Sequence, residues 1–250
     1  MALLFFHEYS YQENGIGGDQ KTPTVLVHGA GSSLLGWPLV LRRLPGLHTI
    51  AVDLPNHGNS TSKEINSIEQ SAENLYSFLT ALDFPQVNLV GFSMGSAIVL
   101  QMLLQFSQYI QKAALLSFTP QPVLNELDST DNPQLDWMQI FINKLFNQNL
   151  SESQRDKIGG PLFTMDREVL YKDLMNAHRY FPDLSGEEST TPVLFLSGSD
   201  DPFYNKDTEQ SMLDHFKNRT IKVLPHAGHL LIWEYPDLVQ NYLLDFFKEK

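Results

Sequence analysis

The sequence predicts an α/β protein with a mostly parallel, doubly wound sheet. One observation is a series of short apolar runs without polar alternation, which is typical of strands covered on both faces. The other is that helix-like segments lie between these runs, and such alternation favours a parallel sheet. The runs that we expect to form strands are Thr24–His28, Thr49–Leu54, Val87–Phe92, Ala113–Phe118, Val193–Ser197 and Ile221–Leu224.

The helix-like segments differ in how apolar they are. Ile68–Leu82 carries apolar residues at helical spacing, and Leu238–Phe247 is amphipathic in the same way. Met94–Phe106 is apolar all round, which indicates a helix buried in the centre of the fold. At the N-terminus, Leu3–Phe6 and Tyr9–Gln12 are expected to form an antiparallel hairpin at the edge of the sheet.

One long segment interrupts the alternation of strands and helices. Residues 119–189 contain helical patterns and no strand-like run. Loops of this length without structure of their own are uncommon, so we predict a helical cap over residues 119–189. It would be inserted into a core built from residues 1–118 and 190–250. The expected cap helices are Leu135–Phe146, Ser151–Ile158 and Arg167–Ala177.

The composition argues against several classes of partner and chemistry. The 250 residues carry a formal net charge of −12, and a chain this acidic is repelled by nucleic acid and by anionic membranes. Cysteine is absent, which excludes disulfides and thiol chemistry. No run approaches the ~20 apolar residues of a membrane-spanning helix, and no histidine–carboxylate spacing resembles a metal site. We therefore expect a cytoplasmic protein that acts on a small molecule, with no nucleic acid, membrane, metal or cofactor; its oligomeric state stays open.

The sharpest chemical signal is Gly91-Phe92-Ser93-Met94-Gly95. It follows a predicted strand and opens a predicted helix, which is the setting of a nucleophile elbow. The sharp turn strains the serine backbone and needs small neighbours, which the two glycines supply. The helix behind the serine also offers backbone N–H groups to a developing anion. We therefore expect Ser93 to be a nucleophile.

A serine hydroxyl is a weak nucleophile and needs a base. His226 and His229 share the loop after the last predicted strand, at the sheet edge where sites form in open α/β folds. A carboxylate that orients the base is expected from Asp200 or Asp201, which follow the preceding strand. The chain order is then serine, aspartate, histidine. The residue pattern leaves both choices open.

Small residues after the first long strand suit a site for negative charge. In the segment His28–Gly31 (His-Gly-Ala-Gly), the backbone can approach a substrate oxygen closely. We expect the N–H groups of Ala30 and Met94 to form an oxyanion hole. The same segment lacks the Gly-Lys-Ser/Thr ending and the third glycine of nucleotide-binding loops, so no nucleotide cofactor is expected.

Together, these segments resemble the α/β-hydrolase family, in its capped branch of small esterase-like enzymes with a serine nucleophile. The resemblance spans nearly the whole chain, and the motifs stand in the order of the family. It implies the α/β-hydrolase fold, with the helical cap inserted after the sixth strand. The matching segments are His28–Gly31, Asp53–Ser60, Gly91–Gly95, Gly198–Pro202 and Ala227–His229.

The resemblance selects between the open alternatives. The family places its acid three residues after the glycine that ends the strand, which implies Asp201. It places its base directly after a pair such as Ala-Gly, which implies His229. Asn56 stands where the family usually has glycine, and Ser96 stands where a second glycine is common. Both departures concern supporting turns and not the reacting groups, and we interpret the Asp53–Ser60 loop as such a turn.

The function implied by the resemblance is hydrolysis of ester-type bonds through a Ser-His-Asp triad and an acyl-enzyme. The serine excludes the dehalogenases and epoxide hydrolases of this fold, which use aspartate. Thioesterases, carbon–carbon bond hydrolases and lyases with the same triad are alternatives, as is a non-catalytic ligand-binding receptor. The residues that we expect to contact an ester-like substrate are Gly29, Trp37, Phe92, Trp137, Phe141 and His178.

Overall fold

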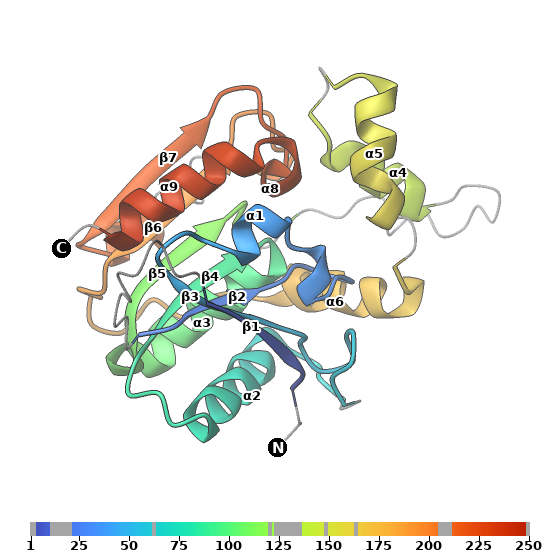
Figure 1. The fold of residues 1–250 in the computed structure, drawn as a ribbon. Coiled ribbons are helices and arrows are strands. Elements are labelled where there is room, and N and C mark those ends of the chain that lie inside the picture. Colours follow the sequence, from blue (N-terminus) through green and yellow to red (C-terminus); the bar gives the residue numbers. More distant parts are fainter. Residues whose placement is uncertain are drawn as a thin grey trace.

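A seven-stranded sheet forms the centre of the fold, with strand order β1-β3-β2-β4-β5-β6-β7 (Figure 1). The structure is a computed structural model, and it describes residues 4–10, 22–61, 64–119, 122, 137–147, 150–162, 165–204 and 212–248. All neighbouring strands run parallel except β1, which is antiparallel to β3. The strands are β1 (Phe6–Ser10), β2 (Thr24–Val27), β3 (His48–Val52), β4 (Val87–Phe92), β5 (Ile110–Leu116), β6 (Val193–Gly198) and β7 (Arg219–Leu224).

The inner strands are buried on both faces, which explains their unbroken apolar runs. In β2, Leu26 packs into one hydrophobic cluster while Val25 and Val27 pack into the other, because successive side chains point to opposite faces. The edge strand β7 is different, since Ile221 and Val223 are 43% and 40% exposed. The prediction of a mostly parallel, doubly wound sheet is confirmed.

The predicted N-terminal hairpin is wrong. Phe6–Ser10 is a single strand, and its whole length pairs with β3, from Phe6 opposite Val52 to Ser10 opposite His48. Glu8, which would have formed the turn of the hairpin, lies within the strand and contacts the His48 ring at 2.6 Å. Pairing over five consecutive residues joins this segment to the central sheet, whereas a short two-stranded hairpin is marginally stable on its own. Gln12 lies outside the described residues.

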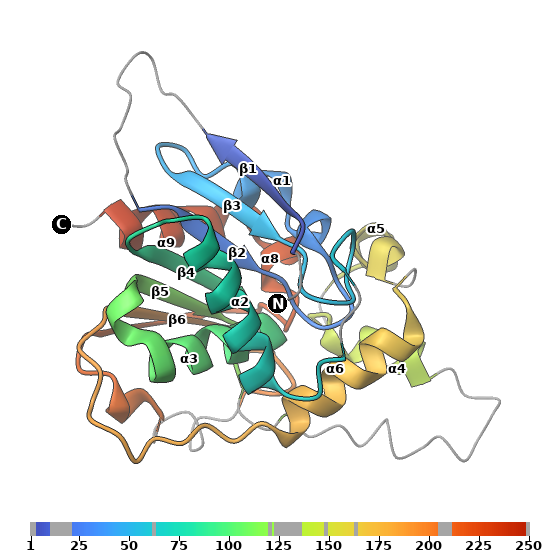
Figure 2. The same cartoon turned by 90° about the horizontal axis from the view of Figure 1, so that it is seen from below.

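Helices cover both faces of the sheet (Figure 2). One face packs against α2 (Ile68–Ala81) and α3 (Met94–Phe106). The other packs against α1 (Leu39–Arg42), α8 (Leu231–Glu234) and α9 (Pro236–Lys248). Ser67 begins α2 by accepting a hydrogen bond from the Gln70 N–H. Short helical turns also occur at η1 (Leu34–Gly36), η2 (Ser107–Tyr109) and residues 212–215.

The described residues between β5 and β6 form three helices: α4 (Trp137–Leu145), α5 (Glu152–Leu162) and α6 (Arg167–Arg179). They lie together beyond the carboxyl ends of the parallel strands (Figure 2). This insertion follows the fifth described strand and not the sixth, because the described N-terminal residues, 4–10, contain one strand instead of two. Asp166 begins α6 by accepting the N–H groups of Glu168 and Val169.

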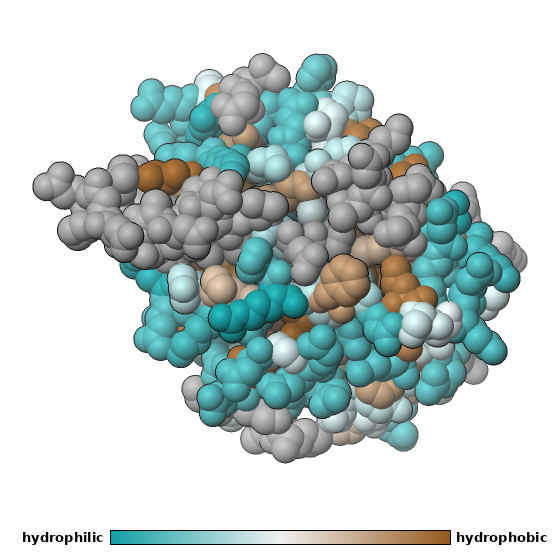
Figure 3. Space-filling view, turned by 180° about the vertical axis from the view of Figure 1, so that it is seen from behind, coloured by the Kyte–Doolittle hydropathy of each residue, from teal (hydrophilic) through white to brown (hydrophobic). Residues whose placement is uncertain are grey.

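The outer surface is mostly hydrophilic on the side shown in Figure 3, where the described apolar residues form only small groups. Large apolar side chains are exposed at scattered positions, such as Phe181 at 72% and Leu35 at 63%. Within the described residues, no helix combines the length and apolar character that crossing a membrane requires.

Candidate active site

Ser93 lies on the sharp turn between β4 and α3. Its backbone angles of φ 53° and ψ −119° are sparsely populated for a residue with a side chain, and such strain costs about 1–3 kcal/mol. The Ser93 N–H donates to the Leu116 carbonyl at 2.9 Å, which ties the turn to β5. Gly95 must be glycine, because a Cβ there would overlap the carbonyl oxygens of Val27 and His28. The turn therefore holds the serine at the end of the strand.

Ser96 strengthens this turn. Its hydroxyl donates to the Leu116 carbonyl at 2.8 Å and accepts the Leu116 N–H at 3.0 Å. Asn56 has φ 67°, the left-handed region that glycine favours and that asparagine tolerates better than most residues. Both departures from the family pattern thus keep the local backbone shape.

His229 bridges the serine and a carboxylate. Its Nε2 lies 2.8 Å from Ser93 Oγ, and its Nδ1 lies 2.8 Å from Asp201 Oδ2. Because an ionised carboxylate can only accept, Nδ1 carries the hydrogen and Nε2 is left to accept the serine proton. The other oxygen of Asp201 accepts the Phe203 N–H at 2.9 Å, which fixes the carboxylate plane. The geometry is that of a nucleophile, a base and an orienting acid.

The competing residues point elsewhere. Asp200 Oδ1 accepts the Ser199 hydroxyl at 2.7 Å, and the His226 N–H donates to the same hydroxyl oxygen at 2.8 Å. The His226 side chain is exposed. The structure therefore brings Asp201 and His229 to Ser93, as the resemblance implied, and leaves Asp200 and His226 in a surface turn.

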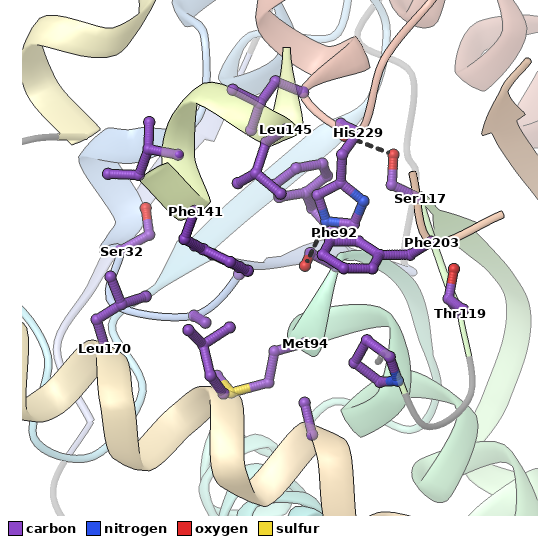
Figure 4. Close-up of a pocket in the computed structure, with 18 of the residues that line it drawn as sticks. Ser32, Phe92, Met94, Ser117, Thr119, Phe141, Leu145, Leu170, Phe203 and His229 are labelled. Carbon is purple, nitrogen blue, oxygen red and sulfur yellow. Dashed lines mark hydrogen bonds between the residues drawn. The ribbon is translucent and has the colours of Figure 1, made fainter. Parts of the chain in front are cut away.

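The backbone of His229 is held from two sides. Its carbonyl accepts the Ser117 hydroxyl at 2.7 Å, the bond drawn in Figure 4, and its N–H donates to the Leu145 carbonyl at 2.9 Å. Glu234 accepts the N–H groups of Gly228 and Asn147, at 2.8 and 2.9 Å. Burial raises the pKa of Glu234, against the opposing effect of these two bonds. The end of α4 is thereby fastened to the histidine loop.

Two backbone N–H groups are available beside the serine. Within the described residues, those of Ala30 and Met94 have no hydrogen-bond partner, and both residues line the same cavity as Ser93. Met94 is the first residue of α3, whose N-terminus carries partial positive charge. The arrangement can stabilise an oxyanion that forms next to Ser93.

The cavity above Ser93 is apolar. It measures about 830 Å³ including its open mouth, and Phe141 and Leu170 from the insertion face His229 and Phe203 across it (Figure 4). Among its described lining residues, His229 is the only histidine, and none is Asp, Glu, Lys or Arg. The lining residues are Gly29, Ala30, Ser32, Phe92, Ser93, Met94, Ala97, Ser117, Thr119, Pro122, Phe141, Ile142, Leu145, Met165, Leu170, Leu174, Ala177, Phe203, His229, Leu230 and Trp233.

Comparison with known proteins identifies the family. Residues 22–176, more than half of the chain, match the family model described as alpha/beta hydrolase fold. The chain belongs to the α/β-hydrolase family. A 2-hydroxy-6-oxononadienedioate/2-hydroxy-6-oxononatrienedioate hydrolase of Escherichia coli is 27% identical to this hydrolase, over 93% of the chain and 89% of the relative.

Solved structures share the fold of this hydrolase. An esterase from Exiguobacterium antarcticum matches with a TM-score of 0.81 and 16% identity, over 99% of this chain and 96% of the other. An enol-lactonase from Burkholderia xenovorans matches with a TM-score of 0.79 and 17% identity, over 99% of this chain and 97% of the other. The protein is thus a hydrolase built on the α/β-hydrolase fold.

The hydrolase cavity includes three of the six predicted substrate contacts: Gly29, Phe92 and Phe141. Trp37 does not line it. Trp37 is 1% exposed and packs edge-on against Phe92, with ring centres 6.3 Å apart, because its size suits the interior behind that ring. The backbone of Trp137 begins α4, but its side chain lies outside the described residues.

His178 is the second predicted contact that lies elsewhere. Its side chain is exposed, and its Nδ1 donates to the Pro122 carbonyl at 2.9 Å. The cavity-facing side of α6 is formed by Leu170, Leu174 and Ala177, which follow helical spacing. His178 comes one residue later and is therefore turned about 100° away from the cavity.

The sequence reasoning missed several lining residues. Phe203 stands two residues after Asp201 and meets the His229 ring edge-on, with centres 5.2 Å apart. Trp233 follows the histidine loop and packs edge-on against Phe92 at 5.2 Å. Their closeness in sequence to Asp201 and His229 is the signal that could have found them. Leu170 and Leu174 carried only the helical spacing that any packed helix shows.

The loop after β3 supports the site as predicted. Asp53 accepts the Leu34 N–H at 2.7 Å and the Asn59 N–H at 2.9 Å. The Ser60 hydroxyl donates to the Asp53 carbonyl at 2.6 Å. These bonds use Asp53 and Ser60 to hold the turn together, beside the segment that contains Ala30.

Proposed function

We propose that this hydrolase cleaves esters of small, uncharged, apolar acids through covalent attack by Ser93. The observation that carries the proposal is the 2.8 Å contact between Ser93 Oγ and His229 Nε2 on the floor of an apolar cavity. A serine next to a base that a carboxylate orients is the arrangement used for nucleophilic acyl transfer.

The mechanism follows from the direction of each hydrogen bond. His229 Nε2 takes the Ser93 proton while Ser93 Oγ bonds to the carbonyl carbon of the ester. Asp201 stabilises the imidazolium that forms. The N–H groups of Ala30 and Met94 stabilise the oxyanion, and one such donor contributes about 3 kcal/mol in comparable sites. His229 then protonates the departing alcohol, and water that it activates releases the acid from Ser93.

Residues 119–189 act in this proposal as a cap that selects the acyl group. Support comes from Phe141, Leu170 and Leu174, which the insertion contributes to the lining of the cavity. Apolar walls without a charged group hold an acyl or aryl chain by burial of its surface. An anionic substrate would lose its hydration there without gaining a partner.

A carbon–carbon bond hydrolase with the same triad is the second candidate. It is favoured by the Escherichia coli relative, whose name specifies a dienedioate and a trienedioate, that is, dicarboxylates. The cavity argues against such a substrate here, because its described lining residues include no lysine or arginine. The Lys144 ammonium lies 5.9 Å from the centre of the Phe203 ring and is not among the lining residues.

Hydrolysis of p-nitrophenyl acetate and butyrate, combined with fluorophosphonate labelling, tests the proposal. The wild type should hydrolyse both esters and label with one equivalent of probe. Ser93→Ala should lose labelling and at least about 10⁴-fold in kcat. Ser107→Ala, an exposed serine at the other end of α3, is the matched control and should behave as wild type.

Two results would contradict the proposal. Absence of both hydrolysis and labelling in the wild type would favour a receptor that keeps the hydrolase shell. Cleavage of a dienedioate with a higher kcat/KM than that of p-nitrophenyl butyrate would favour the carbon–carbon bond hydrolase.

A further inference from the structure

Behind the segment that contains Ala30, polar groups from three elements meet around Asp173 of α6. Asp173 Oδ2 accepts the Gly31 N–H at 2.8 Å and contacts His57 Nε2 at 2.7 Å. Asp173 and His57 are 9% and 5% exposed. A carboxylate of the insertion is therefore bonded directly to the backbone next to Ala30, and to the loop after β3.

The hydrogen-bond partners indicate the charge on His57. Its Nδ1 lies 2.8 Å from the Pro55 carbonyl, and its Nε2 faces the Asp173 carboxylate. Both partners are acceptors, and Asp173 Oδ2 already accepts the Gly31 N–H. Two ring N–H groups satisfy this arrangement, so His57 is an imidazolium paired with an ionised Asp173. Burial lowers the pKa of His57, but the bond to Asp173 and its charge outweigh burial and raise that pKa above its ordinary value.

His28 is held in the opposite state. Its Nδ1 lies 2.8 Å from the Gly29 carbonyl, while its Nε2 accepts the Leu54 N–H at 3.1 Å. One acceptor and one donor are what a neutral imidazole needs. Burial, together with the charge of His57, holds the pKa of His28 well below its usual range, and the ring centres are 4.8 Å apart. The two rings thus link the ends of β2 and β3 beneath the segment 28–31.

Apolar contacts also hold the segment 28–31 against α6. Gly31 has φ 65°, and a Cβ placed there would meet the Leu170 side chain at 3.0 Å and Met165 Sδ at 3.1 Å. The backbone at Gly31 is therefore pressed against the beginning of α6 by both packing and hydrogen bonding. Leu170 also lines the cavity, so α6 contacts both the cavity and the backbone next to Ala30.

We propose that Asp173 is a positioning residue, which with the His57 imidazolium holds the segment 28–31 so that the Ala30 N–H points at the developing oxyanion. This rests on the function proposed above. The oxyanion is absent from the bound ester and develops only in the transition state and the tetrahedral intermediate, so a misplaced Ala30 N–H lowers kcat more than it raises KM. Displacement of one donor costs up to about 10²–10³ in kcat in comparable sites.

The pair also predicts how kcat changes with pH. The charged and titratable groups around His57 are Asp173, Asp166, Glu168 and Lys172 on the α6 side, Asp53 and Glu64 on its own side, and His28 directly after β2. The contribution of the pair is complete when His57 is protonated and is lost as pH rises through its raised pKa. A neutral His57 would turn one lone pair toward either Asp173 or the Pro55 carbonyl.

Steady-state kinetics on p-nitrophenyl butyrate, from pH 5 to pH 10, test the proposal. Asp173→Asn should lower kcat about 10- to 100-fold while KM changes less than about threefold. Asp183→Asn, an exposed carboxylate outside α6, is the matched control and should keep wild-type kinetics. Activity of the wild type and of this control establishes the proposed function independently of Asp173.

His57→Gln supplies a second variant, because its amide can donate to Asp173 and does not titrate. The wild type should lose kcat at alkaline pH, and His57→Gln should lack this limb while keeping the acidic one. Asp173→Asn should cost less in the His57→Gln background than alone. The proposal is overturned if wild-type kcat has no alkaline limb that His57→Gln removes, or if folded Asp173→Asn, checked by circular dichroism, keeps wild-type kcat.

Discussion

The two walls of the cavity are built from different parts of the chain and carry different chemistry. The wall formed by the strand ends carries the groups that we propose to react or to stabilise the oxyanion, which are Ser93, His229 and the N–H of Ala30. The wall formed by the insertion carries apolar side chains such as Phe141 and Leu170. The strand ends can place reacting atoms accurately because they are anchored in a sheet, whereas a helical wall changes its shape by single side chains.

The two walls are also joined, because the insertion bonds to the backbone of the strand-end wall at two points. The Leu145 carbonyl at the end of α4 accepts the His229 N–H at 2.9 Å. Asp173 of α6 accepts the Gly31 N–H at 2.8 Å. The insertion therefore contacts the backbone beside both the proposed base and the proposed oxyanion donor. Substitutions in the insertion should lower the rate of the reaction as well as change substrate choice.

The largest effect is expected from a substitution at the strand ends. Asp201→Asn should lower kcat for p-nitrophenyl butyrate about 10⁴-fold, because an amide in place of the carboxylate favours the wrong histidine tautomer. Asp200→Asn is the matched control and should keep kcat near the wild-type value, since among the described residues the Asp200 side chain bonds only to a surface serine. Equal losses in the two variants would place the orienting acid elsewhere.

An intermediate effect is expected from the apolar wall. Leu174→Ala removes a side chain that lines the cavity. Among the described residues, no hydrogen bond joins Leu174 to the segment 28–31. Its kcat/KM should fall by roughly tenfold for butyrate, because about 1–3 kcal/mol of apolar contact is lost. Longer p-nitrophenyl esters should gain relative to butyrate. An unchanged chain-length profile would show that α6 does not select the acyl group.

The smallest effect is expected from Ser117, whose hydroxyl bonds to the backbone of His229. Ser117→Ala removes the bond to the His229 carbonyl at 2.7 Å and should lower the free energy of unfolding by about 1 kcal/mol. The kcat should fall only a few-fold, because Leu145 still holds the His229 N–H. Urea denaturation and kinetics of the same preparation measure both quantities. A loss of kcat as large as that of Asp201→Asn would mean that Ser117 alone places the base.

Prediction from sequence worked best where one physical cause dominates. The inner strands could be located because burial on both faces leaves no polar position in the run. Ser93 could be located because a strained turn needs glycine on either side. The N-terminal segment was predicted incorrectly because an edge strand has no such signature, and its pairing depends on β3, which lies about 40 residues along the chain.

The failures at Trp37 and His178 have a common reason. Both residue types suit a binding site, but the direction of a side chain is set by the packing around it. Trp37 fills the interior behind Phe92, and His178 is one position past the face that α6 turns to the cavity. Asp173 was missed for the same reason, since a lone carboxylate on a helix usually faces water.

The sequence by itself determined the fold class, the order of the motifs and the residue types at the reacting centre, because each of these depends on neighbours in the chain. Only the tertiary structure decided which partners meet. It placed Asp201 and not Asp200 beside His229, a choice that the residue pattern left open and only the family resemblance indicated, and it brought Asp173 to Gly31 across 142 positions of sequence. Contacts over such separations depend on how helices pack on the strand ends, and no local pattern of residues encodes that geometry.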